Sequence, residues 1–197
     1  MRLYIIRSLL FLFVIPVLPM KQIYNANENK QMFDIAYNNL KYFIRAIPLN
    51  DAELYGFKDK GEFDSVYLGE PIYLYAIDEN KLQKIKTNKI DSVIIISDEI
   101  IFPVLSKGEY KSVLTIKKID GQWKAISFGS RHLAIELKKI RDCWVGHGVK
   151  IIKLYKANKY YFTIPELGGS NLTEIDLSNG TNTDYTKTSD MKQVFNN

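Results

Sequence analysis

The dipeptide Asp120-Gly121 constrains the fold of this chain more than any other short stretch. It joins two runs of strand-forming residues, 110–119 and 122–128, with no loop residues between them. A two-residue Asp-Gly link is typical of a tight β-hairpin, because both residues must adopt positive φ and these residue types tolerate it. The sequence therefore predicts an antiparallel hairpin in the middle of the chain.

The length of this turn also fixes which residues face each other. Trp123 should lie opposite Lys118, and Lys124 opposite Lys117. We expect Trp123 to anchor the hairpin to the core, and its indole N–H would need a partner there. The alternative is a role in a contact surface. Alternation assigns Leu114, Ile116, Trp123 and Ala125 to the core face, and Val113, Thr115, Lys117, Lys124, Ile126 and Phe128 to the other face.

Two segments have the three-and-four spacing of apolar residues that predicts amphipathic helices. The first covers 29–47 and ends before Pro48. The second runs from 131 to about 143, with Ser130 as the expected N-cap. It contains Cys143, the only cysteine, which cannot form an internal disulfide and which we expect to be buried.

The other strand-like runs are short and rich in β-branched or aromatic residues. Strands are predicted over 71–77, 92–97, 100–105, 149–156 and 159–165. Asp98-Glu99 is expected to form a solvated turn between two of them, and the polar segment 50–64 a connecting loop. Pro103 lacks an amide donor, which places it at a sheet edge or a bulge.

Hairpin-linked strands with helices set apart from them indicate an α+β fold. We predict an antiparallel sheet of about five or six strands, an N-terminal amphipathic helix and a second helix after the central hairpin. Both helices are expected on one face of a curled sheet, an order that a cystatin-like arrangement would also satisfy. Residues 27–167 form the single α+β domain, and 168–197 form a polar, partly disordered tail, with disorder expected beyond Gly180.

Residues 1–26 have the pattern of a signal peptide. Arg2 and Arg7 precede an uncharged run of 13 residues, Ser8–Met20, which is short for a membrane-spanning helix of about 20 residues. No clear small-residue cleavage triplet follows, and the alternative is a buried N-terminal element of a cytoplasmic protein. The favoured interpretation is an exported bacterial protein, periplasmic, cell-surface or extracellular, with no membrane span after cleavage.

Charge is distributed unevenly along the chain. The formal net charge of +5 falls to +2 without residues 1–26, which hold three basic residues, so nucleic acid is not an expected partner. Residues 50–102 contain eleven acidic and six basic residues, whereas residues 103–160 contain thirteen basic and four acidic residues. The basic half favours an anionic envelope component or a protein as partner. The alternative is that these lysines only solubilise the outer faces, neutralised by the acidic half.

The candidate contact surface combines four outward basic positions on the central hairpin and the second helix with the tryptophan near the tip of the hairpin. It consists of Lys117, Lys124, Lys139, Arg141 and Trp123. We expect it to bind the anionic partner.

No catalytic motif is present. His132 and His147 are the only histidines, and with Cys143 they are too few for a typical zinc site. Because Cys143 falls at the C-terminal end of its helix, the helix dipole disfavours the thiolate. We therefore predict no catalytic residue, no cofactor and no metal.

The resulting hypothesis is an exported, non-enzymatic binding module of unknown ligand. One alternative is a small exported hydrolase-like enzyme that uses carboxylate and tyrosine groups. Another is a protease inhibitor or pro-segment-like protein, with the turns at 107–108 and 120–121 forming a wedge.

Overall fold

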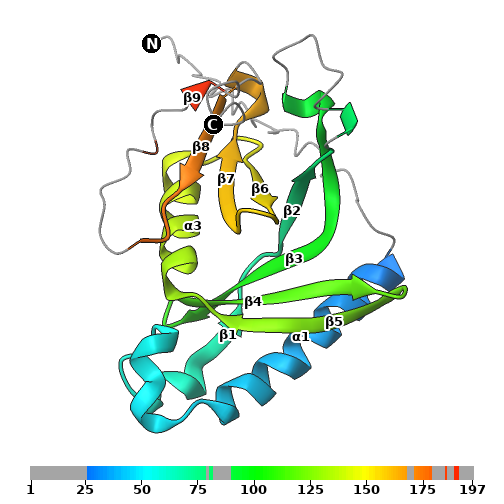
Figure 1. The fold of residues 1–197 in the computed structure, drawn as a ribbon. Coiled ribbons are helices and arrows are strands. Elements are labelled where there is room, and N and C mark those ends of the chain that lie inside the picture. Colours follow the sequence, from blue (N-terminus) through cyan, green and yellow to red (C-terminus); the bar gives the residue numbers. More distant parts are fainter. Residues whose placement is uncertain are drawn as a thin grey trace, which may run out of the picture.

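A computed structural model of the chain describes residues 26–78, 80–81, 90–167, 171–178, 185 and 189–190. The predicted signal peptide lies outside these residues except for Ala26, as does most of the predicted tail. Within the described part the chain is α+β, as expected (Figure 1). The strands are β1 Val66–Leu68, β2 Ile72–Ile77, β3 Ile94–Ser106, β4 Glu109–Ile119, β5 Gln122–Gly129, β6 Lys150–Leu154, β7 Lys159–Thr163, β8 Asn171–Ile175 and β9 Ser189–Asp190. The helices are α1 Ala26–Ala46 and α3 Arg131–Cys143, with the 3-10 helices η1 Leu49–Tyr55, η2 Lys60–Ser65, η3 Ile90–Ser92 and η4 Pro165–Leu167.

The strands form a mixed sheet, larger than the antiparallel sheet that was predicted. Their order is β5-β4-β3-β2-β6-β7-β8-β9, and β1 pairs with β3 beside β2. The parallel pair is β2 with β6. It arises because α3 connects β5, at one edge, to β6 by crossing a face of the sheet. β6 then pairs with β2 on the side away from β3 and runs parallel to it.

The central hairpin is confirmed in detail. Asp120 and Gly121 both have positive φ, 51° and 78°. Lys118 pairs with Trp123, and Lys117 with Lys124, as the turn length predicted.

The face assignment is wrong at the far end of the hairpin. A bulge opposite Thr115 and Ile116 makes Ile126 an extra residue in β5. An extra residue reverses the alternation beyond it, so Phe128 pairs with Leu114 and packs on the same side as Trp123.

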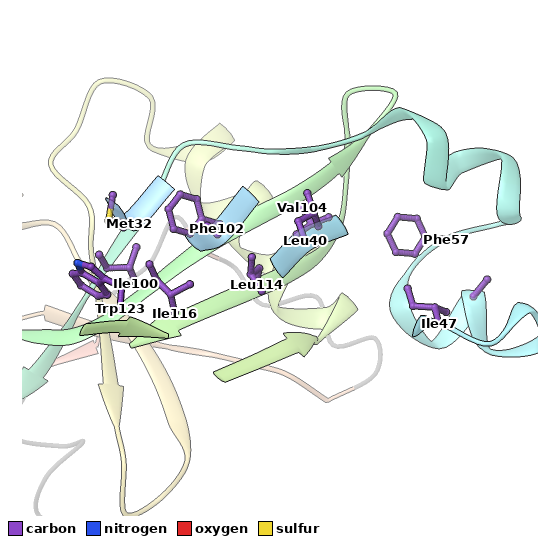
Figure 2. Packing of buried hydrophobic residues seen from close by; sticks show 12 residues of the cluster. Met32, Leu40, Ile47, Phe57, Ile100, Phe102, Val104, Leu114, Ile116 and Trp123 are labelled. Atoms are coloured by element: carbon purple, nitrogen blue, oxygen red, sulfur yellow. The ribbon is translucent and has the colours of Figure 1, made fainter. Parts of the chain in front are cut away.

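The two helices cover opposite faces of the sheet, not one face as predicted. On one face α1 places Met32 and Leu40 against strand residues such as Phe102 and Val104 (Figure 2). On the other face, α3 lies along β6, β7 and β8 (Figure 1). This second cluster includes Leu133, Leu137 and Ile140 of α3, Val113 of β4, Ile151 of β6 and Phe162 of β7. The central strands are therefore covered from both sides, which explains why β3 from Ile100 to Ser106 and β4 from Lys111 to Ile116 are buried on both faces.

The predicted turn at Asp98-Glu99 is wrong, because β3 continues through it as one long bent strand. The pairing of β2 with β3 shifts between Tyr73 and Tyr75, leaving extra β3 residues in a bulge at this point. Ser97 Oγ accepts the Glu99 amide at 3.0 Å within the bulge. Glu99 is thereby only 3% exposed, rather than solvated.

Pro103 occupies an interior strand, at a place where its partner strand is interrupted. β1 pairs with β3 as far as Leu68 opposite Val104, and β2 begins at Ile72 opposite Ile101. The chain leaves the sheet between them, with the Gly69 amide donating to the Pro103 carbonyl at 2.7 Å. No amide donor is needed at Pro103 on this side, which has the same effect as an edge position.

Three local predictions around α3 have different outcomes. Ser130 does precede the helix, but it has φ 65° and its side chain makes no capping hydrogen bond. Cys143 is exposed, so the prediction of burial is wrong; it lies outside the stripe of Leu133, Leu137 and Ile140 that faces the core. Tyr185, from the segment expected to be disordered, is 3% exposed and accepts the Trp144 indole N–H through its carbonyl at 2.8 Å.

Candidate binding groove

A groove of about 710 Å³ runs along the C-terminal half of α1. Its other walls are η2, the start of η1 and the first residue of β1. We call this site the α1 groove. The residues that line it are Tyr37, Leu40, Lys41, Ile44, Arg45, Ile47, Pro48, Leu49, Lys60, Phe63, Asp64 and Val66. Its volume falls within the range of about 300–1,000 Å³ that is usual for small-molecule sites.

Helical spacing explains why α1 contributes one wall. Tyr37, Lys41 and Arg45 recur every fourth residue, so they form one row on the helix surface. Leu40 and Ile44 form the adjacent row, which turns toward the core. The groove thus has apolar residues at its base and polar groups along its rim.

The charge of the α1 groove is positive. Lys41, Arg45 and Lys60 stand on the rim, with Asp64 as the single carboxylate. Among the described residues, none of the ion pairs involves any of these three cations. The Lys41 ammonium lies 4.3 Å from the centre of the Tyr37 ring, which holds one charge at the mouth by a cation–π contact.

The η2 wall is fixed in place by a buried ion pair. Glu62 accepts a hydrogen bond from the Lys111 ammonium at 3.0 Å, and both side chains are less than 10% exposed. The second carboxylate oxygen accepts the Lys58 amide at 2.9 Å. Ser106 of β3 donates to the Glu62 carbonyl at 2.9 Å. Burial alone would raise the pKa of the Glu62 carboxyl, but the bonds from Lys58 and Lys111 outweigh it and lower the pKa.

The predicted contact residues are found in separate environments. Lys117 and Lys124 are cross-strand neighbours on the hairpin. Lys139 pairs with Glu136 at 2.8 Å. Arg141 donates to the Tyr110 hydroxyl at 2.7 Å. Trp123 is 3% exposed and lies in the hydrophobic cluster beneath α1.

Lys117 belongs to a second polar cluster, which we call the crease. It lies where the β6–β7 hairpin meets the bend of β3, and consists of Ser97, Glu99, Lys117, Lys153, Tyr155 and Tyr160. Lys117 donates to one Glu99 oxygen at 3.0 Å, and Lys153 donates to the other at 2.9 Å. Burial raises the pKa of Glu99, but hydrogen bonds and charge from Lys153 and Lys117 lower it overall.

Ion pairs between the two halves neutralise part of the charge segregation seen in the sequence. Among the described residues, lysines of the basic half meet carboxylates of the acidic half in four ion pairs: Lys111–Glu62, Lys117–Glu99, Lys150–Asp91 and Lys153–Glu99. The pairing of β3 with β4 and of β2 with β6 brings the two halves together. Three carboxylates are thereby set against the positive surplus of residues 103–160, and the rest of that surplus remains.

No family model, curated protein or solved structure matches this chain. Within the described part of the chain, no group of three His, Cys, Asp or Glu side chains is arranged to hold a metal. Across the same residues, no helix is long and apolar enough to cross a membrane.

The sequence did not reveal the α1 groove, because the wall opposite α1 includes Lys60, Phe63 and Asp64, from a segment expected to be a connecting loop. Asp59 caps η2 by accepting the Glu62 amide, and an Asp followed three residues later by Glu is the pattern of a capping box. That pattern was a usable signal for a helical turn at 60–65. The remaining signal was the row of Tyr37, Lys41 and Arg45, which recur at every fourth residue of α1.

Proposed function

We propose that this chain is an exported, non-enzymatic binding module whose α1 groove takes a small anionic amphiphile. The observation that supports it is the groove itself: an apolar base beneath three rim cations and one carboxylate. The base suits an alkyl or aromatic moiety, and the rim suits a carboxylate, sulfonate or phosphate. An anionic ligand also fits the class of partner that the charge of the sequence favours.

The binding test uses a fluorescent fatty acid, dansylaminoundecanoate, and its neutral methyl ester. The acid should bind in the groove with increased emission, and the ester should bind more weakly because it lacks the charge. Arg45→Gln should weaken binding of the acid about fivefold, the equivalent of roughly 1 kcal/mol for a partly exposed charge pair.

The matched control is Lys30→Gln, which removes an exposed positive charge from the same helix outside the groove. Binding by this variant should equal that of the wild type. Equal affinity for acid and ester, or an equal loss in both variants, would rule out a specific anion site in the groove.

Export needs its own measurement, since binding does not depend on it. Fractionation of the native host followed by N-terminal sequencing should recover a chain that begins near residue 27 outside the cytoplasm. Recovery of the intact chain from the cytoplasm would refute export without affecting the binding proposal.

The two alternatives have less support. General acid–base catalysis near neutral pH needs groups whose pKa values approach 7. In the crease, burial raises the pKa of Tyr155 and of Tyr160, and the two lysines lower the pKa of Glu99. All three pKa values therefore move away from 7. A protease-inhibiting wedge needs its turns side by side. The turns at 107–108 and 120–121 instead lie at opposite ends of β4, roughly 35 Å apart for a strand of this length.

A further inference from the structure

The crease carries more positive than negative charge. Lys117 and Lys124 are directly paired residues on β4 and β5, and like charges in this arrangement repel each other. Glu99 is the carboxylate that faces Lys117, and its other oxygen is already taken by Lys153. Lys117 and Lys153 thus share Glu99, while Lys124 makes no ion pair among the described residues. With Lys124 as the cross-strand neighbour of Lys117, three ammonium groups stand against one carboxylate, a surplus of two positive charges.

Two of the ammonium groups, those of Lys153 and Lys117, lie beside tyrosine rings. The Lys153 ammonium lies 4.8 Å from the centre of the Tyr155 ring and 5.6 Å from that of Tyr160. The Lys117 ammonium lies 5.6 Å from the Tyr155 ring. Each ammonium has three N–H donors and gives one to Glu99, so donors remain for a ligand. Tyr155 is 44% exposed, and the crease is therefore open to solvent at this ring.

We propose that the crease is a second binding site, which takes a phosphate group between Lys117, Lys124 and Lys153. The surplus of two positive charges matches a phosphate dianion, and an anion between Lys117 and Lys124 would relieve their repulsion. The crease lies on the face of β4 that α3 also covers, whereas α1 packs on the other face. The two sites are thus independent, and this proposal does not rest on the α1 groove.

The test is a titration of the full chain with sodium pyrophosphate and with glycerol-3-phosphate, followed by amide NMR at constant ionic strength. Both probes carry the phosphate chemistry, and their comparison distinguishes a free phosphate from an esterified one. Shifts should concentrate at 97–99, 117, 124 and 153–156. Lys124→Gln should weaken binding about two- to fivefold, as expected for loss of one exposed charge, and Lys124→Arg should retain it.

Lys124 is the right position to change because it is exposed and makes no ion pair among the described residues, so its replacement leaves the Glu99 cluster intact. Lys30→Gln, which removes an exposed charge outside both sites, is the matched control and should bind phosphate as the wild type does. Shifts scattered over the surface, or an equal loss in Lys124→Gln and Lys30→Gln, would overturn the proposal. If the chain binds phosphate but not dansylaminoundecanoate, the proposal for the α1 groove is refuted and the proposal for the crease holds.

Discussion

Replacing Lys111 with methionine tests whether the Glu62–Lys111 pair holds the groove wall to the sheet. Glu62 is 5% exposed, and Lys111 is 7% exposed, so Lys111→Met leaves a carboxylate buried without its cation. Removal of one partner from a buried pair costs about 3–5 kcal/mol. Because Glu62 keeps the bond from the Lys58 amide, we expect the lower end, about 3 kcal/mol in the free energy of unfolding. That is a large part of the roughly 5–15 kcal/mol available to a domain.

The dependence on pH separates this mechanism from a simple packing defect. The pKa of Glu62 is lowered in the folded protein, so the pair contributes its stabilisation above the ordinary carboxyl pKa and loses it as pH falls through the folded pKa. In Lys111→Met the buried carboxyl binds a proton more readily, which relieves the uncompensated charge. The difference in unfolding free energy between wild type and variant should therefore be largest near pH 7 and shrink toward pH 4.

Urea denaturation followed by circular dichroism at pH 7 and pH 4 measures this difference. The double variant Glu62→Gln/Lys111→Met should recover much of the loss, because no buried charge remains. Lys138→Met breaks the exposed pair with Asp142 and should leave the denaturation midpoint nearly unchanged. A Lys111→Met deficit below about 1 kcal/mol, or one independent of pH, would refute the reasoning.

Two further predictions concern single positions. Gly56→Ala should destabilise the fold much more than Gly108→Ala does. Both glycines have positive φ, which costs alanine about 1–2 kcal/mol. A Cβ at Gly56 would also lie 2.0 Å from the Lys111 carbonyl oxygen, whereas a Cβ at Gly108 would meet nothing within 4 Å. Equal denaturation midpoints for the two variants would contradict the close approach. Cys143 is exposed, so a maleimide should label the native chain at nearly the rate seen in urea, and strong protection in the native state would contradict its position on α3.

Local structure was predictable where a few neighbouring residues determine it. The Asp120-Gly121 turn fixed both a backbone conformation and a register, and both are confirmed. The amphipathic segments likewise became α1 and α3. The errors lie where a distant partner decides the outcome. The bulge at Ile126 and the burial of Glu99 depend on neighbouring strands. The sequence pattern of a single strand therefore cannot predict either of them.

The placement of positive charge shows the same limit at the level of function. Net charge along the sequence marked 103–160 as the basic region, but the fold sets this region beside the acidic one, and ion pairs cancel part of the surplus. The rim cations of the α1 groove come instead from Lys41, Arg45 and Lys60, outside that region. Within the part of the chain that the structure describes, none of the three forms an ion pair with a carboxylate. A charge run thus predicts a binding surface only after the strand order is known, since the order decides which charges are neutralised inside the fold.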